Sequence, residues 1–301
     1  MPFRVTETMT RSDFMARINA QRSRLSVLQE RLATNKRINR PSDDPAGAEA
    51  VLNLRTSQKE IDGFKRNAQA VDQQLVAADD SLTGYENILE RIRSLVSQGL
   101  SDTTTQAAKN SIATELDALK ARILNVANTK YGDSYLYGGT RQNAPPFDPT
   151  TQAPAGTPAS SQYIQIEPGT NAIPVGVTAE SVFSDGASTI FADLTAAAAA
   201  LRGTGNPVAD KAALHATMSR LQVYTDQVTL AHAVVGANMN VTEMALDRLT
   251  NDSLSIDGRA GQIEDADFAQ TALELSDAQS TLEATLQTAA AGRRSLFDYL
   301  S

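Results

Sequence analysis

Residues 64–96 read FKRNAQAVDQQLVAADDSLTGYENILERIRSLV, and their apolar positions recur in steps of four and three. Such a seam predicts an α-helix that buries one narrow stripe against partner helices. The predicted helix runs from Pro45 to about Gln98, which is about 80 Å at 1.5 Å per residue. A helix of that length is too long for the core of a compact domain, so the stretch predicts an elongated rod. The seam residues are Phe64, Ala68, Val71, Leu75, Ala78, Leu82, Tyr85, Leu89, Ile92 and Val96.

The same spacing recurs farther along the chain, from Ile112 to Val126 and from Leu214 to Leu249. Between these seams the character changes, because seven of the eleven prolines lie between Pro145 and Pro174. Alternating residues at 163–166 and 173–177 predict short strands with exposed edges. The expected fold class is therefore mainly α: an elongated antiparallel coiled-coil or helical-bundle rod formed by both chain ends, with a small β-rich inserted domain.

Helix boundaries follow from capping residues. Thr10 and Asp13 form a capping box that predicts the start of a first helix ending near Thr34. After the break at residues 40–44, Asp44 can cap the next helix and Pro45 suits its first position. Asp257-Gly258 predicts a turn, with a final helix starting near Asp265.

Neither end of the chain is expected to fold alone, because an isolated helix is marginal in water without a partner. Apolar seams mark both ends: Phe14, Ile18, Leu25, Leu28 and Leu32 near the start, and Leu275, Leu282, Ala289 and Leu296 near the finish. We expect residues 1–44 and 262–301 to be polymerisation helices that are disordered in the monomer. Residues 45–140 and 191–261 form the predicted rod domain, and residues 141–190 form the predicted outer domain.

Positive charge is concentrated at the start of the chain, although the whole sequence has a net charge of −8. Residues 1–40 carry nine basic and three acidic side chains. A basic arm could bind nucleic acid or an acidic lipid surface, or act as a transit peptide. It lacks the interleaved aromatic residues of a nucleic-acid site. We interpret its basic groups as solvated helix positions, or as partners of acidic residues such as Glu264, Asp265 and Asp267.

Candidates for catalysis are few. The chain has two histidines and no cysteine, which excludes disulfides, thiolate chemistry and cysteine-based zinc sites. His232 lies on a predicted seam, which favours a packed polar residue over a general base, and His215 is too distant to share a ligand with it. Asp43, Asp44 and Glu49 could bind a hard cation, but helix capping and the helix dipole explain Asp44 and Glu49 more simply. We predict no enzymatic activity, no cofactor and no metal.

Targeting signals are also missing from the sequence. No apolar stretch approaches the roughly 18 residues that span a bilayer. The first residues lack the apolar core and cleavage site of a signal peptide, so export is expected to use another system.

Segments at both ends of the chain resemble the bacterial flagellin family. Residues 32–48, LATNKRINRPSDDPAGA, are similar to its N-terminal signature, and residues 263–269, IEDADFA, are similar to its C-terminal signature. The resemblance covers roughly residues 1–140 and 205–301. Residues 41–45, PSDDP, and 135–139, YLYGG, resemble the branch of that family found at the junction of hook and filament.

The resemblance implies a structural protein that joins the hook-associated ring to the flagellin filament outside the cell. It implies export through the flagellar type III channel without a cleaved signal peptide. The implied partners are hook-associated protein 1, flagellin, copies of the chain in a ring, and an export chaperone on the C-terminal helix, with no nucleic acid and no membrane. The expected assembly residues are Phe14, Ile18, Leu25, Leu28, Leu32, Phe268, Leu275, Leu282, Leu286 and Leu296.

Two alternatives remain open. A short filament-forming flagellin has the same physical design but polymerises with itself into long fibres. A basic-arm protein that binds nucleic acid or a membrane surface uses the same N-terminal charge in a different way.

Overall fold

The computed structural model describes the backbone of residues 3–300 except 142, 155, 157–158 and 170–171, and the side chains of the described residues from 12 to 288. The chain divides into two compact units. We call residues 1–60 with 252–301 the terminal unit, and residues 61–251 the central unit. Helices α2 (Pro45–Leu100) and α6 (Pro207–Glu264) each contribute to both units.

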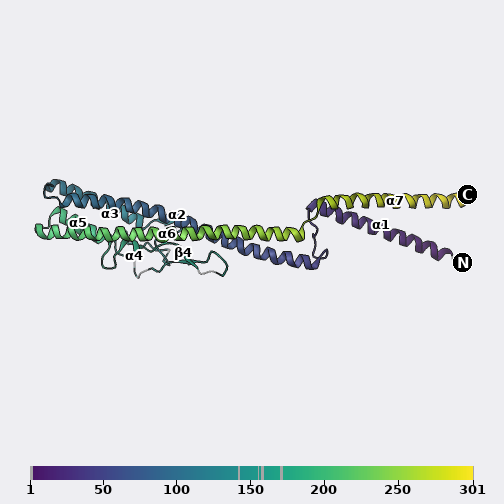
Figure 1. Ribbon diagram of the computed structural model, residues 1–301, viewed down its shortest axis with the longest axis horizontal. Helices are drawn as coiled ribbons and strands as arrows, with labels where there is room; N and C mark the ends of the chain where they lie inside the picture. Colours follow the sequence, from purple (N-terminus) through teal and green to yellow (C-terminus); the bar gives the residue numbers. More distant parts are fainter. Residues whose placement is uncertain (1–2, 142, 155, 157–158, 170–171, 301) are drawn as a thin grey trace. The chain divides into compact units, whose positions relative to one another are not determined.

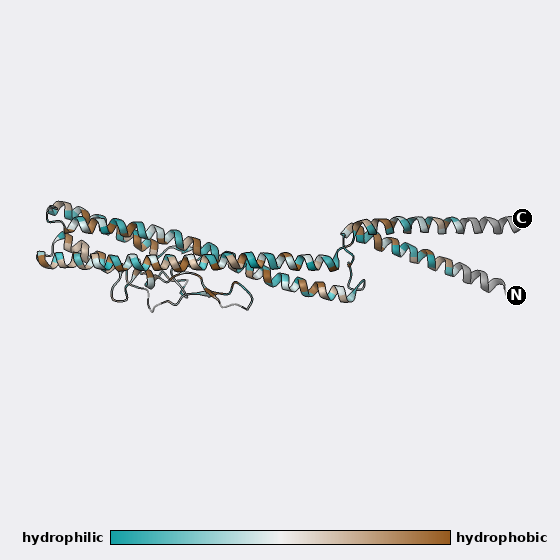
Figure 2. Cartoon of the chain, viewed as in Figure 1, coloured by the Kyte–Doolittle hydropathy of each residue, from teal (hydrophilic) through white to brown (hydrophobic). Residues whose placement is uncertain are grey.

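In the central unit, α2 and α6 pack with α3 (Gln106–Ala127) and α5 (Ile190–Arg202), as Figure 1 shows. Apolar and polar residues alternate along these helices (Figure 2). The seam predicted on α2 forms part of one continuous core, together with the seams of α3 and α6. Its completely buried members include Ala68, Val71, Leu75, Leu82, Tyr85, Ile92 and Val96.

Close packing explains the glycine near the end of α2. A Cβ atom on Gly99 would lie 2.4 Å from Cδ2 of Leu201 on α5. A larger residue there would require the side chain of Leu201 to move, so Gly99 leaves room for this leucine against α2. α3 then begins after Thr105, whose side chain accepts a hydrogen bond from the N–H of Ala108 at 3.3 Å.

The segment between α3 and α5 contains strands, but they are short. β1 (Lys130–Tyr131) pairs with β2 (Ser134–Tyr135), and β3 (Tyr163–Ile164) pairs with β4 (Ile173–Pro174). Both pairs are antiparallel, and the short helix α4 (Ala179–Phe183) follows them. The alternation at 163–166 and 173–177 thus marks strands of two residues each. Proline lacks the N–H needed for further pairing, so Pro174 limits β4.

Aromatic rings attach this segment to the helices. The ring of Phe183 in α4 lies 4.6 Å from Tyr85 of α2, 5.3 Å from Tyr137 and 6.1 Å from Phe147, measured between centroids. Phe147 in turn lies 4.9 Å from Phe191 of α5. Most of these contacts are edge-on, the geometry that aromatic pairs prefer, and all five rings are buried.

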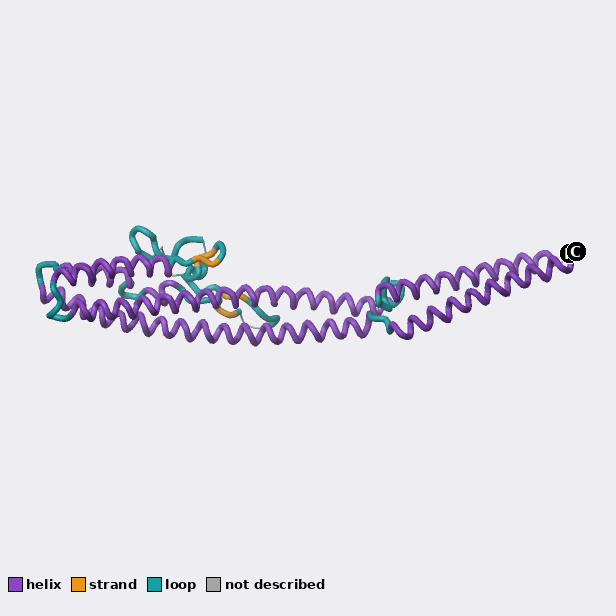
Figure 3. Tube along the Cα trace, turned by 90° about the horizontal axis from the view of Figure 1, so that it is seen from above, coloured by secondary structure: helices purple, strands orange, loops and turns teal. Residues whose placement is uncertain are grey.

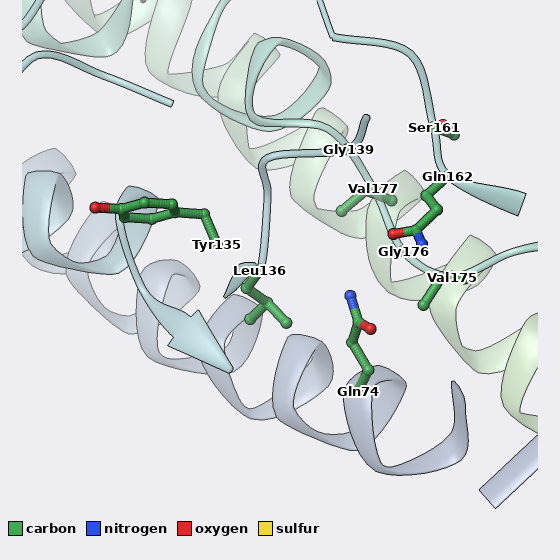
Figure 4. Close-up of a pocket in the computed structure, with 9 residues that line it drawn as sticks. All are labelled: Gln74, Tyr135, Leu136, Gly139, Ser161, Gln162, Val175, Gly176 and Val177. Carbon is green, nitrogen blue, oxygen red and sulfur yellow. The ribbon is translucent and has the colours of Figure 1, made fainter. Parts of the chain in front are cut away.

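A cavity beneath the segment has no room for a ligand. Figure 4 shows it between Gln74 of α2 and loop residues that include Leu136, Gln162 and Val175. Its volume is about 10 Å³, roughly the space of one water molecule. The cavity therefore belongs to the packing of the segment on α2.

Two of the predicted boundaries are wrong. α6 runs through Asp257-Gly258 to Glu264, because a glycine inside a helix costs about 1 kcal/mol relative to alanine but does not end it. A Cβ atom on Gly258 would meet no heavy atom within 4 Å, so neighbouring groups do not force a turn there. At the other end, α1 (Phe3–Thr34) already begins at Phe3, so the capping box at Thr10 and Asp13 does not start the helix.

The terminal unit is built on α1 and α7 (Phe268–Leu300). These helices run antiparallel side by side, with both chain termini at the same end (Figure 3). The predicted fold class is confirmed: the described chain is mainly α, an antiparallel helix pair joins both chain ends, and the only sheets in the described residues have two strands each.

Candidate assembly site

Two neighbouring aspartates fix the turn between α1 and α2. Oδ2 of Asp43 accepts hydrogen bonds from the backbone N–H groups of Asn39 (3.1 Å) and Arg40 (2.9 Å). Oδ1 of Asp44 accepts a hydrogen bond from the N–H of Gly47 at 3.0 Å, which caps α2 as predicted. The hydrogen bond from Gly47 holds the pKa of Asp44 below its usual value, because it favours the ionised carboxylate.

Gly47 occupies a place where a larger residue does not fit. A Cβ atom there would lie 2.6 Å from Oδ2 of Asp44 and 2.7 Å from Cδ1 of Ile38. Ile38 is buried, so it cannot move outward without exposing apolar surface. The glycine therefore allows the turn to pack against the first turn of α2.

A short backbone connection, which we call the clasp, joins residues 35–38 to residues 263–266. The N–H of Arg37 donates to the carbonyl of Glu264 at 2.7 Å, and the N–H of Ala266 donates to the carbonyl of Asn35 at 3.0 Å. Lys36 and Asp265 form the antiparallel bridge between these bonds. Asn35 has a φ of 56°, a left-handed conformation that asparagine tolerates and that ends α1. The two ends of the sequence are thus paired through their backbones.

The side chain of Glu264 makes the charged contacts of the clasp. Its carboxylate accepts two hydrogen bonds from Nη2 of Arg55, at 2.9 and 2.7 Å, and forms a further ion pair with Lys36. Burial by itself would raise the pKa of Glu264, but hydrogen bonds from Lys36 and Arg55 outweigh it and leave the pKa lowered. The interpretation of the basic arm as a partner of Glu264 is thus confirmed for Lys36.

α7 begins immediately beyond the clasp. Oδ1 of Asp267 accepts a hydrogen bond from the N–H of Gln270 at 3.0 Å, the contact of an N-cap. The first helical residue is therefore Phe268, three positions after the predicted start at Asp265.

The structure brings most of the predicted assembly residues to the contact between α1 and α7. Ile18 and Leu28 are buried there, at 6% and 3% exposure. The half-buried members are Phe14, Leu25, Leu32, Leu275 and Leu282. A pair of helices cannot enclose a seam completely, and this explains the partial exposure.

Two predicted assembly residues are exposed, and a third has a side chain that the structure does not describe. Phe268 and Leu286 are exposed at 64% and 41%. The side chain of Leu296 lies outside the described residues. The role of all ten residues in assembly stays a prediction.

The seam of α7 contains two small residues that the leucine pattern alone did not indicate. Thr271 and Ala278 are buried at 7% and 3% exposure, more deeply than Leu275 and Leu282. Each lies four residues before a seam leucine, so the heptad spacing contained the signal. Their small size lets α1 approach closely.

Apolar side chains remain uncovered elsewhere on the terminal unit. Met15, Leu52, Leu254 and Leu273 are between 53% and 65% exposed. Single exposed apolar residues are common on protein surfaces. Here they accompany a seam that is itself incompletely enclosed, which favours additional helices as neighbours.

Other groups of interest lie in the central unit and have structural partners. Nδ1 of His232 lies 3.0 Å from Oδ1 of Asp79, and Nε2 lies 3.8 Å from the carboxylate of Glu86. Within the described side chains, no three histidine or acidic groups are arranged to hold a metal ion. In the same part of the chain, no helix has the length and apolar character needed to cross a bilayer.

The chain is similar to known flagellar proteins. Residues 5–142 match the family described as bacterial flagellin N-terminal helical region. Flagellin of Listeria innocua is 26% identical over 84% of this chain and 82% of its own length. Flagellar hook-associated protein 3 of Escherichia coli is 25% identical over 85% of this chain and 86% of its own length.

Residues 5–142 of this chain are therefore similar to the N-terminal helical region of bacterial flagellins.

The matched region contains most of α1, all of α2 and α3, and residues 35–38 of the clasp. The fold agrees with a solved structure, the flagellar junction protein FlgL of Legionella pneumophila, at a TM-score of 0.57 and 15% identity. That likeness covers 72% of this chain and 100% of the FlgL chain.

Proposed function

We propose that this protein is a structural component of the bacterial flagellum that joins the hook-associated ring to the flagellin filament. The proposal rests on the terminal unit, in which α1 and α7 leave their apolar seam half-buried. The backbone hydrogen bonds of the clasp join the bases of these two helices. One relative, a flagellar hook-associated protein 3, aligns with most of this chain and with most of its own length. The similarity to these flagellar proteins supports a structural protein rather than an enzyme.

The mechanism is multivalent helix packing. The seam of each α1–α7 pair keeps exposed edges, and neighbouring subunits supply the helices that cover them. Complete burial of a large apolar side chain stabilises by about 1.5–3 kcal/mol, so covering Phe268, Leu273 and Leu286 could offset the entropy lost by ordering the ends. We expect the ends outside about residues 45–260 to gain order on assembly, with residues 141–190 facing outward.

The proposed neighbours are hook-associated protein 1 on one side, flagellin on the other, and copies of the chain in a ring between them. An export chaperone that covers α7 before assembly would shield its exposed apolar residues, such as Phe268 and Leu273. Export through the flagellar channel would place the protein outside the cell, at the junction.

Deletion of the gene tests the junction assignment. Cells that keep intact hooks but release unpolymerised flagellin into the medium would support it, and cells that keep attached filaments would contradict it. Electron microscopy of hooks and measurement of shed flagellin give the two readouts.

The second candidate is a short filament-forming flagellin, which the likeness to Listeria innocua flagellin supports. Sedimentation of the purified chain under filament-forming conditions separates the two functions. A junction protein stays in the supernatant without its partners, whereas a flagellin pellets as fibres.

A further inference from the structure

The outer side of α1 carries a second regular stripe that the contact with α7 does not use. Its residues recur in steps of three and four, which places them on one face of the helix. They alternate between arginine and a small or branched apolar residue: Arg17, Ala20, Arg24, Val27 and Arg31. Arg17, Ala20, Arg24 and Val27 are exposed, and Arg31 is half-buried.

The arginines of this stripe have no acidic partner within the described residues. In this described part, the ion pairs of α1 and the following turn involve Glu30, Lys36, Arg37 and Arg40 instead. The Nε atom of Arg31 is buried and has no hydrogen-bond partner in the described residues. A row of unpaired guanidinium groups beside a helix seam is typical of positions that select a partner helix by charge.

α7 carries a stripe of complementary chemistry. From Phe268 to residue 288 it has three acidic residues and no basic residue. Leu273, Asp277, Ser280 and Ala284 recur in steps of four, three and four, and all are exposed. Glu274 lies beside Asp277, one turn back along the helix.

These two stripes do not meet within one chain. α1 and α7 pack against each other, yet no ion pair links them in the described part of the terminal unit. Arg17, Arg24 and Asp277 are exposed, so both stripes remain available to another helix of opposite charge. Glu274 is half-buried and accepts a hydrogen bond from Nε2 of Gln270 at 3.0 Å.

We propose that the outer stripe of α1 docks onto the outer stripe of α7 in a second copy of this chain, with Arg17 and Arg24 facing Asp277 and Glu274. The inference rests on the proposed function and names the contact between copies in the ring. Because the two stripes differ, the contact is head-to-tail, and it can propagate around a closed ring. The charges fix which helix is accepted and in which register.

Charge reversal tests this pairing in cells that lack the natural gene. R17E/R24E places like charges against α7 of the next copy, so filament retention should fall about tenfold or more. E274R/D277R should have the same effect. The matched control is R66E/R93E, which makes the same change in net charge at exposed arginines of the central unit that form no ion pair in the described residues. It should retain filaments as the unmodified protein does.

Co-expression of the two reversed variants distinguishes contacts between copies from effects within one chain. If the stripes meet between copies, the acidic α1 of one variant faces the basic α7 of the other, and filament retention returns. If the charges act only within a chain, or if the arginines bind nucleic acid or lipid, the mixture stays defective and the inference is overturned.

The proposed function and this inference fail in different ways. Filaments that stay attached after deletion of the whole gene would refute the junction assignment. Filaments that are lost on deletion but retained by R17E/R24E would refute only the pairing of the stripes. Circular dichroism of each purified variant confirms that the helices still form.

Discussion

Nη2 of Arg55 lies 2.9 and 2.7 Å from the two carboxylate oxygens of Glu264, although 209 positions separate these residues in the sequence. Arg55 belongs to the first turns of α2 and Glu264 is the last residue of α6. Their contact joins the N-terminal part of α2 to the C-terminal end of α6, next to the backbone clasp. Glu264 also pairs with Lys36, and that ion pair links the two regions that resemble the flagellin signatures.

Substitution of Glu264 by alanine should loosen the clasp. Lys36 and Arg55 would lose their shared partner, and we expect a loss of about 1–3 kcal/mol in the local opening free energy, because hydrogen bonds to charged groups are lost. Hydrogen exchange at the N–H groups of Arg37 and Ala266 measures this opening. Glu283 is exposed on α7 and has no ion pair in the described residues, so E283A should leave the exchange unchanged.

The clasp should also weaken in acid. The pKa of Glu264 in the folded chain is lower than its ordinary value of about 4.5, since the ion pairs outweigh the effect of burial. A lowered pKa means that the ionised group stabilises the fold above the ordinary value, and that this contribution disappears as the pH falls through the folded pKa. Exchange at Arg37 should therefore accelerate below pH about 4.5, after correction for the intrinsic rate.

The same titration of E264Q provides the control for acid sensitivity. Glutamine cannot ionise, so the part of the acceleration that comes from Glu264 should be absent. An unchanged acid response in this variant would assign the effect to other carboxylates, such as Asp44.

Gly47→Ala should disturb the turn before α2. The new methyl group would meet Asp44 and buried Ile38 at less than 3 Å, so the cap or the apolar contact must give way. We expect a loss of about 1–3 kcal/mol, as in other overpacked sites. Thermal unfolding measures it, and G84A serves as control because a Cβ atom there would meet nothing within 4 Å. G84A should stabilise slightly through its higher helix propensity.

Two buried tyrosines should respond in opposite ways to removal of the hydroxyl group. The hydroxyl of Tyr224 donates to Oδ2 of Asp193 at 2.7 Å, so Y224F leaves a buried carboxylate without one of its partners and should cost about 1–3 kcal/mol. The hydroxyl of Tyr85 is buried without a hydrogen bond, and burial raises the pKa of Tyr85 well above its usual value. Y85F should therefore be neutral or stabilising in urea unfolding.

Phe268→Ser should separate assembly from folding. The side chain is 64% exposed, so its loss should change the unfolding free energy by no more than about 0.5 kcal/mol. Filament retention should nevertheless fall, because the proposed neighbour loses an apolar contact. Val208→Ser, at a 79% exposed position of the central unit, should change neither quantity. Normal retention in F268S would remove this residue from the proposed surface.

The long-range architecture was predictable because seam spacing fixes which helix face is buried. The α2 seam from Ala68 to Val96 was identified in this way, as were the cap at Asp44 and the break before Pro45. Glycine was the main source of error. Gly258 sits inside α6, whereas the pattern Asp-Gly predicted a turn, because local turn preference is weaker than the packing of a long helix.

The candidate site was only partly predictable. Ile18, Leu28 and their neighbours followed from spacing, but Ala278 and Thr271 were hidden among polar and small residues. Pairing of Arg55 with Glu264 depends on two helix ends that meet in space, and no local pattern in the sequence encodes that distance. Which partner covers Phe268 depends on molecules outside the chain.

Closure of the clasp has a consequence for synthesis. Asn35 and Arg37 leave the ribosome well before their backbone partners Glu264 and Ala266. A chain truncated before residue 264 lacks these partners and cannot make the bonds, even if its first helices form. Closure of the clasp therefore depends on residues that lie more than two hundred positions beyond Asn35 in the sequence.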